Sequence, residues 1–437
     1  MKTKSLPHRI GIVSLGCAKN LVDSEVLMKQ LDASSFTTIL DPSEKDKIDT
    51  AIINTCGFIL DAKNESVETI LNFVRAKAEG HIQSLFVMGC LSERYREQLS
   101  IEIPEVDGFY GVNELKTIVE RVGGRFRKEL LGERILGTPS HYAYLKIAEG
   151  CDRHCSFCSI PAIRGKHISR PMEEIIREAT ILVKNGVKEI NVISQDTTYY
   201  GLDLYKKRRL PELLENLAEI KGLEWIRLHY TYPDGFPPEV LDVISRHDNI
   251  CKYIDIPLQH INSRILTSMK RGIDKQKTLE LVKLIRAKLP HGVIRTTLIT
   301  GYPGETEKDF KELQDFISQS RFDRLGVFTY SHEEGTGAYE LKNTVPGKVK
   351  QERASTLMEM QEEISLRLNS ARIGSFLKVI IDREEEEFYV GRTEFDSPEI
   401  DNEVLIPKTG KQLNIGSFYM GRITAAESFD LYAEIED

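Results

Sequence analysis

Three cysteines, Cys151, Cys155 and Cys158, lie within eight consecutive positions of the stretch EGCDRHCSFCSIPAIRGK. Their C-x3-C-x2-C spacing has three chemical interpretations: disulfide pairing, a structural zinc site or an iron–sulfur cluster. His154 and His167 lie near enough in sequence to complete a zinc site. A zinc ribbon, however, usually repeats its cysteine pair downstream, and this chain does not. A [4Fe–4S] cluster held by three thiolates leaves one iron open to a small-molecule ligand, and the spacing favours such a cluster.

Composition indicates the redox environment of these thiols. The chain has 437 residues, of which 41% are hydrophobic and 29% charged, enough for two to four domains with buried cores. Seven cysteines are too few and too scattered for a disulfide framework. The first residues, MKTKSLPHRIGIVSLG, lack the apolar core of a secretory signal, and no stretch approaches the roughly 20 apolar residues of a membrane span. We therefore expect a reducing, cytoplasmic location.

The cysteine motif has an aromatic residue, Phe157, just before its last cysteine, and it resembles the signature of the radical S-adenosylmethionine (SAM) superfamily. The resemblance implies that Cys151, Cys155 and Cys158 hold a [4Fe–4S] cluster whose open iron chelates SAM. It further implies that an electron from this cluster, here named the radical cluster, cleaves SAM to a 5′-deoxyadenosyl radical. In such enzymes the cofactor supplies the difficult chemistry, and the protein supplies position and exclusion of water.

Three further cysteines, Cys17, Cys56 and Cys90, each end a short apolar run typical of a strand: GIVSLGC, AIINTC and LFVMGC. Helical sequence follows each run, as in a parallel α/β sheet, whose ligands bind beyond the carboxyl ends of the strands. The three thiolates can therefore converge although they are far apart in sequence. Any one of them alone would more often pack as a small buried hydrophobe. Cys251, in NICKYIDIPLQH, opens a predicted strand instead of ending one, and we assign it to core packing.

Strand-like and helical segments alternate regularly between residues 142 and 336. Six runs have strand character: YAYLKIAEGC, EINVISQD, EWIRLHYTY, YIDIPLQ, VIRTTLITGYPGE and RLGVFTYS. Amphipathic stretches such as MEEIIREATILVKNGV and EKDFKELQDFISQSRF separate them. Six strand–helix units are too few to close an eight-stranded barrel. The predicted fold class is therefore α/β, with an open partial barrel whose site lies at the carboxyl ends of its strands.

Polar residues at the predicted strand ends are candidates for contacts with a nucleoside or a substrate. They are Ser194, Gln195 and Asp196 after the second strand, Gln259 and His260 after the fourth, and Gly301, Gly304 and Glu305 after the fifth. Residues of these types are also common in caps and turns, and a lone histidine is more often structural than a ligand. The sequence therefore names no catalytic residue beyond the cluster ligands.

Residues 373–437 differ in composition from the chain before them. A long helical stretch at residues 347–374 leads into the runs FLKVIID, EEFYVGRTEF, NEVLIP and SFYMGRITAAESFDLYAEI, which predict a small antiparallel β-barrel. This segment has 6 Lys and Arg against 15 Asp and Glu, a net charge of −9, whereas the whole chain has −8. Such a module should repel RNA and attract a basic protein. Alternatively, its most acidic stretch, DREEEEF, is only a solvated turn.

The first cysteine motif and the C-terminal module together indicate a family. SLGCAKNLVDSE, at residues 14–25, closely resembles the RimO branch of the radical SAM methylthiotransferase family, and the acidic barrel resembles the TRAM module of that family. The tRNA-modifying branch usually has Gln-Met between the cysteine and the asparagine. Ala18 departs from the pattern because proline is usual there, and the change should affect only the turn beside Cys17.

The resemblance implies an organisation, a set of cofactors and a reaction. It implies a methylthiotransferase domain at residues 8–124, a radical SAM core at 137–366 and a TRAM domain at 369–437. It implies SAM and two [4Fe–4S] clusters, the second of which, here named the auxiliary cluster, is held by Cys17, Cys56 and Cys90. The radical would abstract hydrogen from the β-carbon of an aspartate in protein twelve of the small ribosomal subunit. The auxiliary cluster would present sulfur, and another SAM would methylate it. An electron donor and a sulfur source are further implied partners, whereas neither a membrane nor a nucleic acid is a primary one.

Two other functions share part of this pattern. A tRNA adenosine methylthiotransferase would carry both clusters, and the charge of the last module and the AKN element distinguish it. A non-enzymatic iron–sulfur electron carrier would need neither an open iron nor a six-unit barrel. Cleavage of SAM separates such a carrier from an enzyme.

Overall fold

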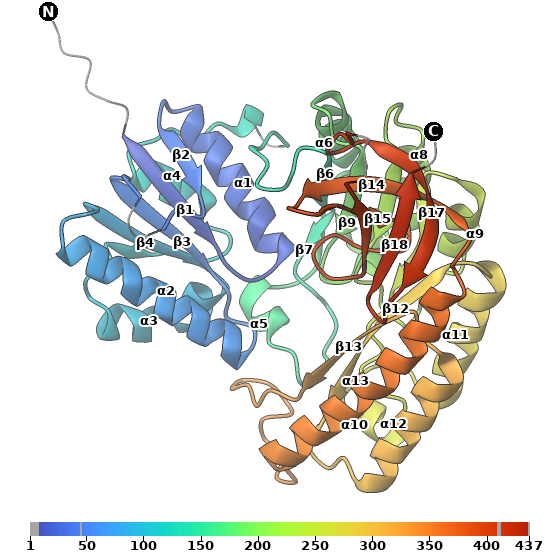
Figure 1. Cartoon of the computed structure of the whole chain (residues 1–437). Coiled ribbons are helices and arrows are strands. Elements are labelled where there is room, and N and C mark those ends of the chain that lie inside the picture. The colour runs from blue at the N-terminus through green and yellow to red at the C-terminus, as the bar shows by residue number, and fades with distance from the viewer. Residues whose placement is uncertain (1–7, 44–45, 131, 409–411, 436–437) are drawn as a thin grey trace, which may run out of the picture. The chain divides into compact units, whose positions relative to one another are not determined.

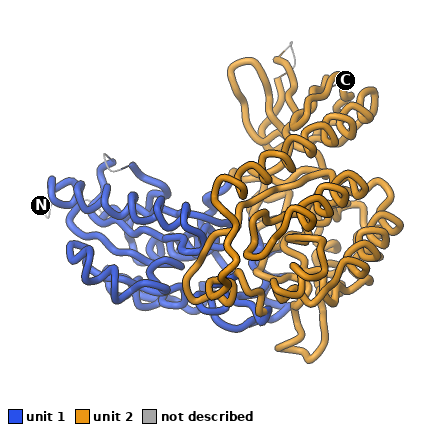
Figure 2. The backbone as a smooth tube through the Cα atoms, turned by 90° about the horizontal axis from the view of Figure 1, so that it is seen from below, with its two compact units in different colours: residues 1–138, 144–153, 158–181 blue, residues 139–143, 154–157, 182–437 orange. Residues whose placement is uncertain are grey.

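The computed structural model describes residues 8–43, 46–130, 132–408 and 412–435. The chain forms two compact units, drawn in different colours in Figure 2. Unit 1 comprises residues 1–138, 144–153 and 158–181, and unit 2 comprises residues 139–143, 154–157 and 182–437. The expected absence of a secretory signal rests partly on residues 1–7, which lie outside the described residues. Each unit thus gathers segments that are separated in the sequence.

Unit 1 contains a five-stranded parallel sheet with helices beside it (Figure 1). The strand order is β2-β1-β3-β4-β5, with β1 Arg9–Ser14, β2 Thr37–Leu40, β3 Thr50–Thr55, β4 Ser84–Gly89 and β5 Gly108–Phe109. The helices are α1 Ala18–Asp32, α2 Leu60–Ala78, α3 Cys90–Glu102 and α4 Leu115–Arg121. The strands predicted before Cys17, Cys56 and Cys90 are confirmed as β1, β3 and β4. The sequence does not predict β2 and β5, because β2 is short and only partly buried and β5 has two residues.

The sheet of unit 1 is covered on both faces. Ile12 and Ile52 belong to one hydrophobic cluster, whereas Val13 and Ile53 belong to another. Successive residues of a strand point to opposite faces, so a sheet buried on both sides has continuous apolar runs instead of alternating ones. Full burial of each such side chain contributes about 1.5–3 kcal/mol. The strand ends that carry the cysteines are therefore held by a well-packed core.

Six further strands form an open sheet in the order β13-β12-β11-β10-β9-β6. Their bounds are β6 Tyr142–Lys146, β9 Glu189–Ile193, β10 Trp225–Leu228, β11 Ile250–Asp255, β12 Val293–Thr300 and β13 Arg324–Thr329. Neighbouring strands from β9 to β13 are parallel. Among the described residues the two edge strands, β6 and β13, do not pair with each other. The predicted open partial barrel of six strands is therefore confirmed.

Helices and short elements connect these strands. The helices are α5 Ile160–Arg164, α6 Met172–Lys184, α7 Leu202–Tyr205, α8 Leu210–Ala218, α9 Glu239–Arg246, α10 Ser263–Ser268, α11 Lys275–Lys288, α12 Glu307–Ser320 and α13 Gly347–Ser370. The short elements are strands β7 Ala148–Glu149 and β8 Ile168–Ser169 and the 3-10 turns Lys128–Leu130 and Thr197–Tyr199. The long helix predicted before the last module is α13. No helix within the described ranges combines the length and the hydrophobicity needed to cross a membrane.

The C-terminal module is a closed five-stranded barrel in the order β14-β15-β16-β18-β17. Its strands are β14 Phe376–Glu384, β15 Phe388–Thr393, β16 Glu403–Pro407, β17 Phe418–Ala426 and β18 Asp430–Ile435. The predicted barrel is confirmed, but one strand pair differs from the predicted antiparallel arrangement, because β16 and β18 are parallel. An odd number of strands cannot alternate in direction around a closed ring, so at least one pair must be parallel.

Within unit 2 the closed barrel packs against the partial barrel. Trp225 and Tyr253 of the partial barrel share a hydrophobic cluster with Ile380 and Phe395 of the closed barrel. Ion pairs also join the two barrels: Arg324 with Asp396, Arg295 with Asp401, and Glu189 with Arg392. Two acidic side chains of the C-terminal module, Asp396 and Asp401, are therefore partners of arginines of the partial barrel.

Candidate active site

Cys17, Cys56 and Cys90 lie beyond the ends of three neighbouring strands of unit 1. Cys17 stands between β1 and α1, Cys56 follows β3, and Cys90 is the first residue of α3 after β4. The register pairs β1 with β3 up to Ser14, and β3 with β4 up to Thr55, so the three strands end at one edge of the sheet. In parallel sheets this carboxyl edge is where ligands bind.

Two glycines allow the loops that carry these cysteines to touch. Gly16 has a φ of +90°, and a Cβ added there would lie 2.8 Å from Sγ of Cys56. A Cβ added at Gly57 would lie 2.9 Å from the carbonyl carbon of Cys90. Neither position can carry a side chain unless a neighbour moves. The loop of Cys17 therefore contacts Cys56, and the loop after Cys56 contacts Cys90.

The thiols at this edge influence each other's ionisation. Burial raises the pKa of Cys56 and raises the pKa of Cys90 to about 11. The negative charge of Cys17 raises the pKa of both further, whereas the Arg164 cation acts against these effects. The three sulfurs therefore lie within electrostatic range of one another. A metal binds the thiolate form, so assembly of an iron cluster here must release protons.

Asn20, in the first turn of α1, ties two of the cysteine loops together. Its Nδ2 donates to the carbonyl of Leu15 at 2.8 Å and to the carbonyl of Thr55 at 3.0 Å. The side chain of Asn54 in turn donates to the carbonyl of Asn20 at 2.9 Å. The hydroxyl of Ser66 bonds both the N–H and the carbonyl of Cys56, at 3.0 Å each. The SLGCAKNLVDSE motif thus builds the frame of the site and does not only supply Cys17.

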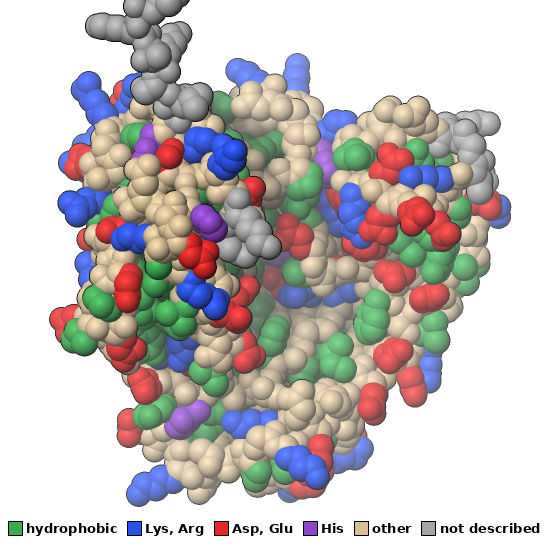
Figure 3. All heavy atoms as spheres, turned by 60° about the vertical axis from the view of Figure 1, so that its left-hand side comes forward, with side chains coloured by type: hydrophobic (Ala, Val, Ile, Leu, Met, Phe, Trp, Pro, Cys, Tyr) green, Lys and Arg blue, Asp and Glu red, His purple; other side chains and the backbone are tan. Residues whose placement is uncertain are grey.

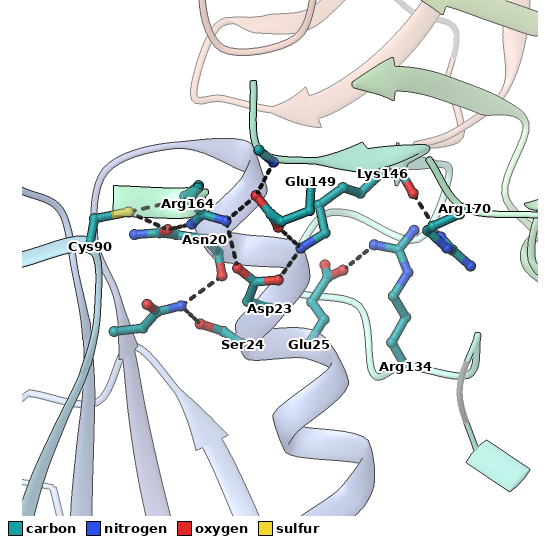
Figure 4. Close-up of polar contacts among 12 residues, drawn as sticks. Asn20, Asp23, Ser24, Glu25, Cys90, Arg134, Lys146, Glu149, Arg164 and Arg170 are labelled. Atoms are coloured by element: carbon teal, nitrogen blue, oxygen red, sulfur yellow. Dashed lines mark hydrogen bonds and ion pairs between the residues drawn. The ribbon is translucent and has the colours of Figure 1, made fainter. Parts of the chain in front are cut away.

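A buried ion network lies beside Cys90 (Figure 4). Arg164, the last residue of α5, donates through Nε to Sγ of Cys90 at 3.4 Å, and through Nη1 to Glu149 at 2.9 Å and Asp23 at 3.3 Å. Lys146 pairs with the same two carboxylates. Burial opposes ionisation of Glu149, but the Lys146 and Arg164 cations outweigh it and hold the pKa of this carboxyl well below its ordinary range. The two cations of the network therefore keep Glu149 ionised although it is buried.

The C-x3-C-x2-C segment joins β7 to α5, and its ends are closed by backbone contacts within unit 1. The N–H of Cys151 donates to the carbonyl of Gly165 at 3.1 Å. Gly150 has a φ of +76°, and a Cβ added there would lie 2.0 Å from the carbonyl oxygen of Lys166. Only glycine fits this approach. The contacts therefore bring together the two ends of the segment 151–165, which carries the three cysteines and α5.

Cys155, in the middle of this segment, belongs to unit 2. Its Sγ is 3.3 Å from the hydroxyl of Tyr232 and 3.3 Å from Nη1 of Arg271. The Arg271 guanidinium stacks on the Tyr232 ring at 4.2 Å from its centroid. The N–H of Ser156 donates to the carbonyl of Met269 at 3.0 Å and fixes the backbone next to the cysteine. The sulfur of Cys155 therefore accepts from one cation, Arg271, whereas the hydroxyl of Tyr232 donates to the carbonyl of Arg271 at 3.1 Å.

The remaining zinc-type ligands near the motif are not gathered around it. His154 is exposed, and His167 is buried with Nε2 at 3.1 Å from the hydroxyl of Ser169. In the part of the chain that the structure describes, no three Cys, His, Asp or Glu side chains lie close enough to hold one metal ion. The ligands of a [4Fe–4S] cluster lie farther apart than those of one ion, because each thiolate binds a different iron.

Sequence profiles of three families match successive parts of the chain. The Radical SAM superfamily matches residues 145–317, the Uncharacterized protein family UPF0004 matches residues 9–111, and the TRAM domain matches residues 373–435. These families together cover the three parts of the chain in which the sequence motifs lie.

Curated relatives named "Ribosomal protein uS12 methylthiotransferase RimO" match nearly the whole chain. The relative from Phocaeicola vulgatus is 54% identical over 429 residues, which are 98% of this chain and 99% of that protein. The relative from Flavobacterium johnsoniae is 54% identical over 435 residues, which are 99% of this chain and 100% of that protein. The chain belongs to the RimO family. It is thus a radical SAM transferase of the methylthiotransferase class. As a member of this family it uses SAM and [4Fe–4S] clusters as cofactors.

Solved structures show the same fold at low sequence identity. The radical SAM methyltransferase TsrM from Kitasatospora setae matches with a TM-score of 0.54 and 15% identity over 74% of this chain and 75% of that chain. The cobalamin-dependent radical SAM enzyme OxsB matches with a TM-score of 0.51 and 13% identity over 82% of this chain and 56% of that chain. These likenesses confirm the α/β fold class with a radical SAM partial barrel.

Two of the strand-end candidates of this RimO family chain have structural roles. His260 is fully buried, and its Nδ1 accepts from the N–H groups of Ile261 and Asn262 at 2.9 and 3.0 Å. Glu305 accepts from the N–H of Gly301 at 2.9 Å and from Nη1 of Arg353 at 2.6 Å. These contacts hold a loop and fasten α13, whereas a contact of either side chain with a ligand stays a prediction.

The other strand-end candidates remain predictions. The side-chain oxygens of Ser194 and Gln259 are buried without a hydrogen-bond partner among the described residues. Gln259 also has a φ of +72°, a conformation that is rare for residues other than glycine. Asp196 accepts from the hydroxyl of Thr198 at 2.5 Å, and Gly304 has a φ of +83°. Gln195 follows Ser194 at the end of β9.

Sequence reasoning missed Arg164, Tyr232 and Arg271, although each touches a cysteine of a predicted cluster. Arg164 gives a weak signal, because it follows the cysteine motif within the same short stretch. Tyr232 and Arg271 give none, because they lie far from Cys155 in sequence and only the barrel brings them to it.

Cys251, assigned to core packing, is 1% exposed and lies in β11 within a hydrophobic cluster.

Proposed function

We propose that this chain inserts a methylthio group at the β-carbon of an aspartate in ribosomal protein uS12. The observation that carries the proposal is the 54% identity, over nearly the full length of both chains, to proteins that bear that name. We propose that Cys151, Cys155 and Cys158 hold the radical cluster. When bound, the cofactors supply a 5′-deoxyadenosyl radical, a sulfur atom and a methyl group.

The second part of the proposal is that Cys17, Cys56 and Cys90 hold the auxiliary cluster. Its support is the common edge of β1, β3 and β4, together with the close approaches at Gly16 and Gly57. Three thiols held at one buried edge provide ligands of the class that iron–sulfur clusters require.

The side chains around both triads orient the ligands. Arg271 donates to the sulfur of Cys155, and the hydroxyl of Tyr232 lies 3.3 Å from it, so both side chains fix the position of this ligand. Asn20 fixes the loops before Cys17 and Cys56. The unpartnered oxygen of Ser194 is a candidate contact for SAM or the aspartate.

We further propose that the C-terminal barrel recruits uS12 as a basic protein. The exposed turn carries Glu384, Glu385, Glu386 and Glu387, although Glu384 pairs with Lys408 and Glu385 with Arg383. On the face drawn in Figure 3, charged side chains of both signs are interspersed. Lys408 and Arg383 belong to the same module, so these pairs reduce the local charge of the turn and leave the net charge of −9 unchanged.

The organisation and setting of the activity are also proposals. We propose three domains, at residues 8–124, 137–366 and 369–437, because the three family profiles fall within these bounds. We place the enzyme in the cytoplasm, where an electron donor and a sulfur source of the cell serve it and where thiols stay reduced.

Anaerobic incubation of the reconstituted, reduced protein with uS12 and SAM tests the substrate. Mass spectrometry of uS12 peptides should show one methylthio group on an aspartate. A parallel incubation with tRNA should give unmodified nucleosides. Modified tRNA together with unmodified uS12 would overturn the assignment in favour of the tRNA branch.

A further inference from the structure

Arg164 links the segment of one cysteine triad to a cysteine of the other. It ends α5, six residues after Cys158, and its Nε–H donates to Sγ of Cys90 at 3.4 Å. These residues all belong to unit 1. Figure 4 shows the guanidinium between the sulfur of Cys90 and the carboxylates of Asp23 and Glu149.

The guanidinium of Arg164 is fixed in this orientation. Nη1 donates to Glu149 at 2.9 Å and to Asp23 at 3.3 Å, and Nη2 donates to Oδ1 of Asn20. A planar guanidinium that is held along one side cannot turn its Nε away. The side chain is 2% exposed, so water does not compete for the Nε–H. The donor is therefore in place before any cluster is assembled.

The positive and negative charges around Arg164 cancel without a contribution from the Cys90 sulfur. Arg164 and Lys146 supply two positive charges, and Asp23 and Glu149 supply two negative ones. A guanidinium stays protonated in proteins, so the Nε–H of Arg164 is a donor whether Cys90 is a thiol or a thiolate. As a thiol, Cys90 donates to Oδ1 of Asn20 at 3.8 Å, and it loses this hydrogen bond when it becomes a thiolate.

We propose that Arg164 is a positioning residue that sets the reduction potential of the auxiliary cluster through its Nε–H to the Cys90 sulfur. The inference rests on the proposed function, which places that cluster on Cys17, Cys56 and Cys90. A hydrogen bond to a ligand sulfur stabilises the more negative, reduced cluster and so raises its potential. The stretch that supplies the ligands of the radical cluster would thereby also set the electronic state of the other cluster.

Arg164→Lys tests the proposal, because lysine keeps the charge but cannot present the same fork of donors. The background carries Cys151→Ala, Cys155→Ala and Cys158→Ala, so only the auxiliary cluster remains. A redox titration followed by electron paramagnetic resonance should give a more negative midpoint potential for Arg164→Lys, with unchanged iron content. The matched control is Arg134→Lys, which changes another buried arginine. Arg134 pairs with Glu25 and Glu178, and among the described residues it has no hydrogen bond to a cysteine. Its potential should equal that of the background.

A second measurement detects the contact between Arg164 and the cluster by spectroscopy. Background protein labelled with 15N only in arginine should show, by pulsed paramagnetic resonance, hyperfine coupling of a nitrogen to the reduced cluster. Arg164→Lys should abolish this coupling, and Arg134→Lys should keep it. An unshifted potential in Arg164→Lys, or no arginine coupling in the background, would overturn the role of Arg164 alone. A background that holds no cluster at all would instead overturn the ligand assignment in the proposed function.

Discussion

Arg324 of the partial barrel donates through Nε to Asp396 of the closed barrel at 2.9 Å, and the two side chains are 6% and 1% exposed. A carboxylate of the acidic module is therefore a buried partner of a barrel arginine. Asp401 of the closed barrel likewise forms an ion pair with Arg295 of the partial barrel. Acidic residues of the segment 373–437 therefore help to dock the module on the partial barrel.

Breaking this pair should destabilise unit 2 strongly. Asp396→Ala leaves Arg324 buried without its carboxylate, and we expect a loss of about 3–5 kcal/mol in the free energy of unfolding. The control is Glu385→Ala, which removes an exposed partner of Arg383 and should cost less than about 1 kcal/mol. Chemical denaturation measures both. Equal, small losses in the two variants would show that the buried pair does not hold the barrels together.

Reversing the charge of the exposed turn should slow the encounter with uS12. Changing Glu384, Glu385, Glu386 and Glu387 to Lys should lower the on-rate at low salt, with a smaller effect on the off-rate. The effect should fade as salt rises, because exposed charges are screened beyond about 10 Å at 0.1 M. Stopped-flow or surface binding kinetics measure these rates, and cleavage of SAM without uS12 should not change.

A matched control for this reversal changes the same number of exposed acids elsewhere. Asp61, Glu65, Glu68 and Glu79, on or next to α2, are exposed, and changing them to Lys alters the net charge equally. If both sets slow association to the same degree, net charge and not the C-terminal turn is responsible.

Cys251→Ser should leave both clusters intact. Burial raises the pKa of Cys251 to about 12, so the group is a neutral thiol at physiological pH and not a ready metal ligand. The serine hydroxyl in an apolar cluster should cost about 1–3 kcal/mol in stability. Iron analysis and SAM cleavage should match the parent. Loss of a cluster in this variant would contradict the assignment of ligands.

Asp255 should contribute pH-dependent stability to unit 2. Burial opposes its ionisation, but Arg295, His229 and the N–H of Tyr230 outweigh burial and hold the pKa of Asp255 well below its ordinary range. A carboxyl with a lowered pKa stabilises the fold above the ordinary carboxyl pKa of about 4, and this contribution disappears as pH falls towards the folded-state pKa. Asp255→Asn should therefore be less stable than the parent by about 2–4 kcal/mol at neutral pH.

The difference between parent and Asp255→Asn should shrink below about pH 4, as the parent loses the same contribution. Urea unfolding from about pH 7 to about pH 3 measures it. A difference that stays constant over this range would show that Asp255 is not held ionised by its neighbours.

Much of the fold could be predicted because its signals are local. The apolar runs before Cys17, Cys56 and Cys90 are β1, β3 and β4, and the six runs of the partial barrel are its six strands. The strand β2 gave no comparable signal, because TTIL is short and partly exposed. The parallel pairing of β16 with β18 follows from closing five strands into a ring, which no single run reveals.

The surroundings of the candidate site could not be predicted, because they depend on contacts between distant residues. The spacing of the cysteines is local, whereas the contact of Arg164 with Cys90 crosses 74 residues and that of Arg271 with Cys155 crosses 116. The sequence places His260 and Glu305 among several candidates at strand ends, but it does not reveal that His260 accepts from a loop backbone and Glu305 from Arg353. The net charge of residues 373–437 likewise does not reveal that Asp396 is buried against an arginine of the partial barrel.

Iron content combined with SAM cleavage tests most directly whether two separate cysteine triads hold two clusters with different tasks. The anaerobically reconstituted parent should bind about eight irons per chain as two [4Fe–4S] clusters. The triple variant Cys17→Ala, Cys56→Ala, Cys90→Ala should bind about four and still cleave SAM when reduced. Its counterpart, Cys151→Ala, Cys155→Ala, Cys158→Ala, should also bind about four but cleave none. A first triple variant that loses all its iron, or keeps all of it, would contradict the account.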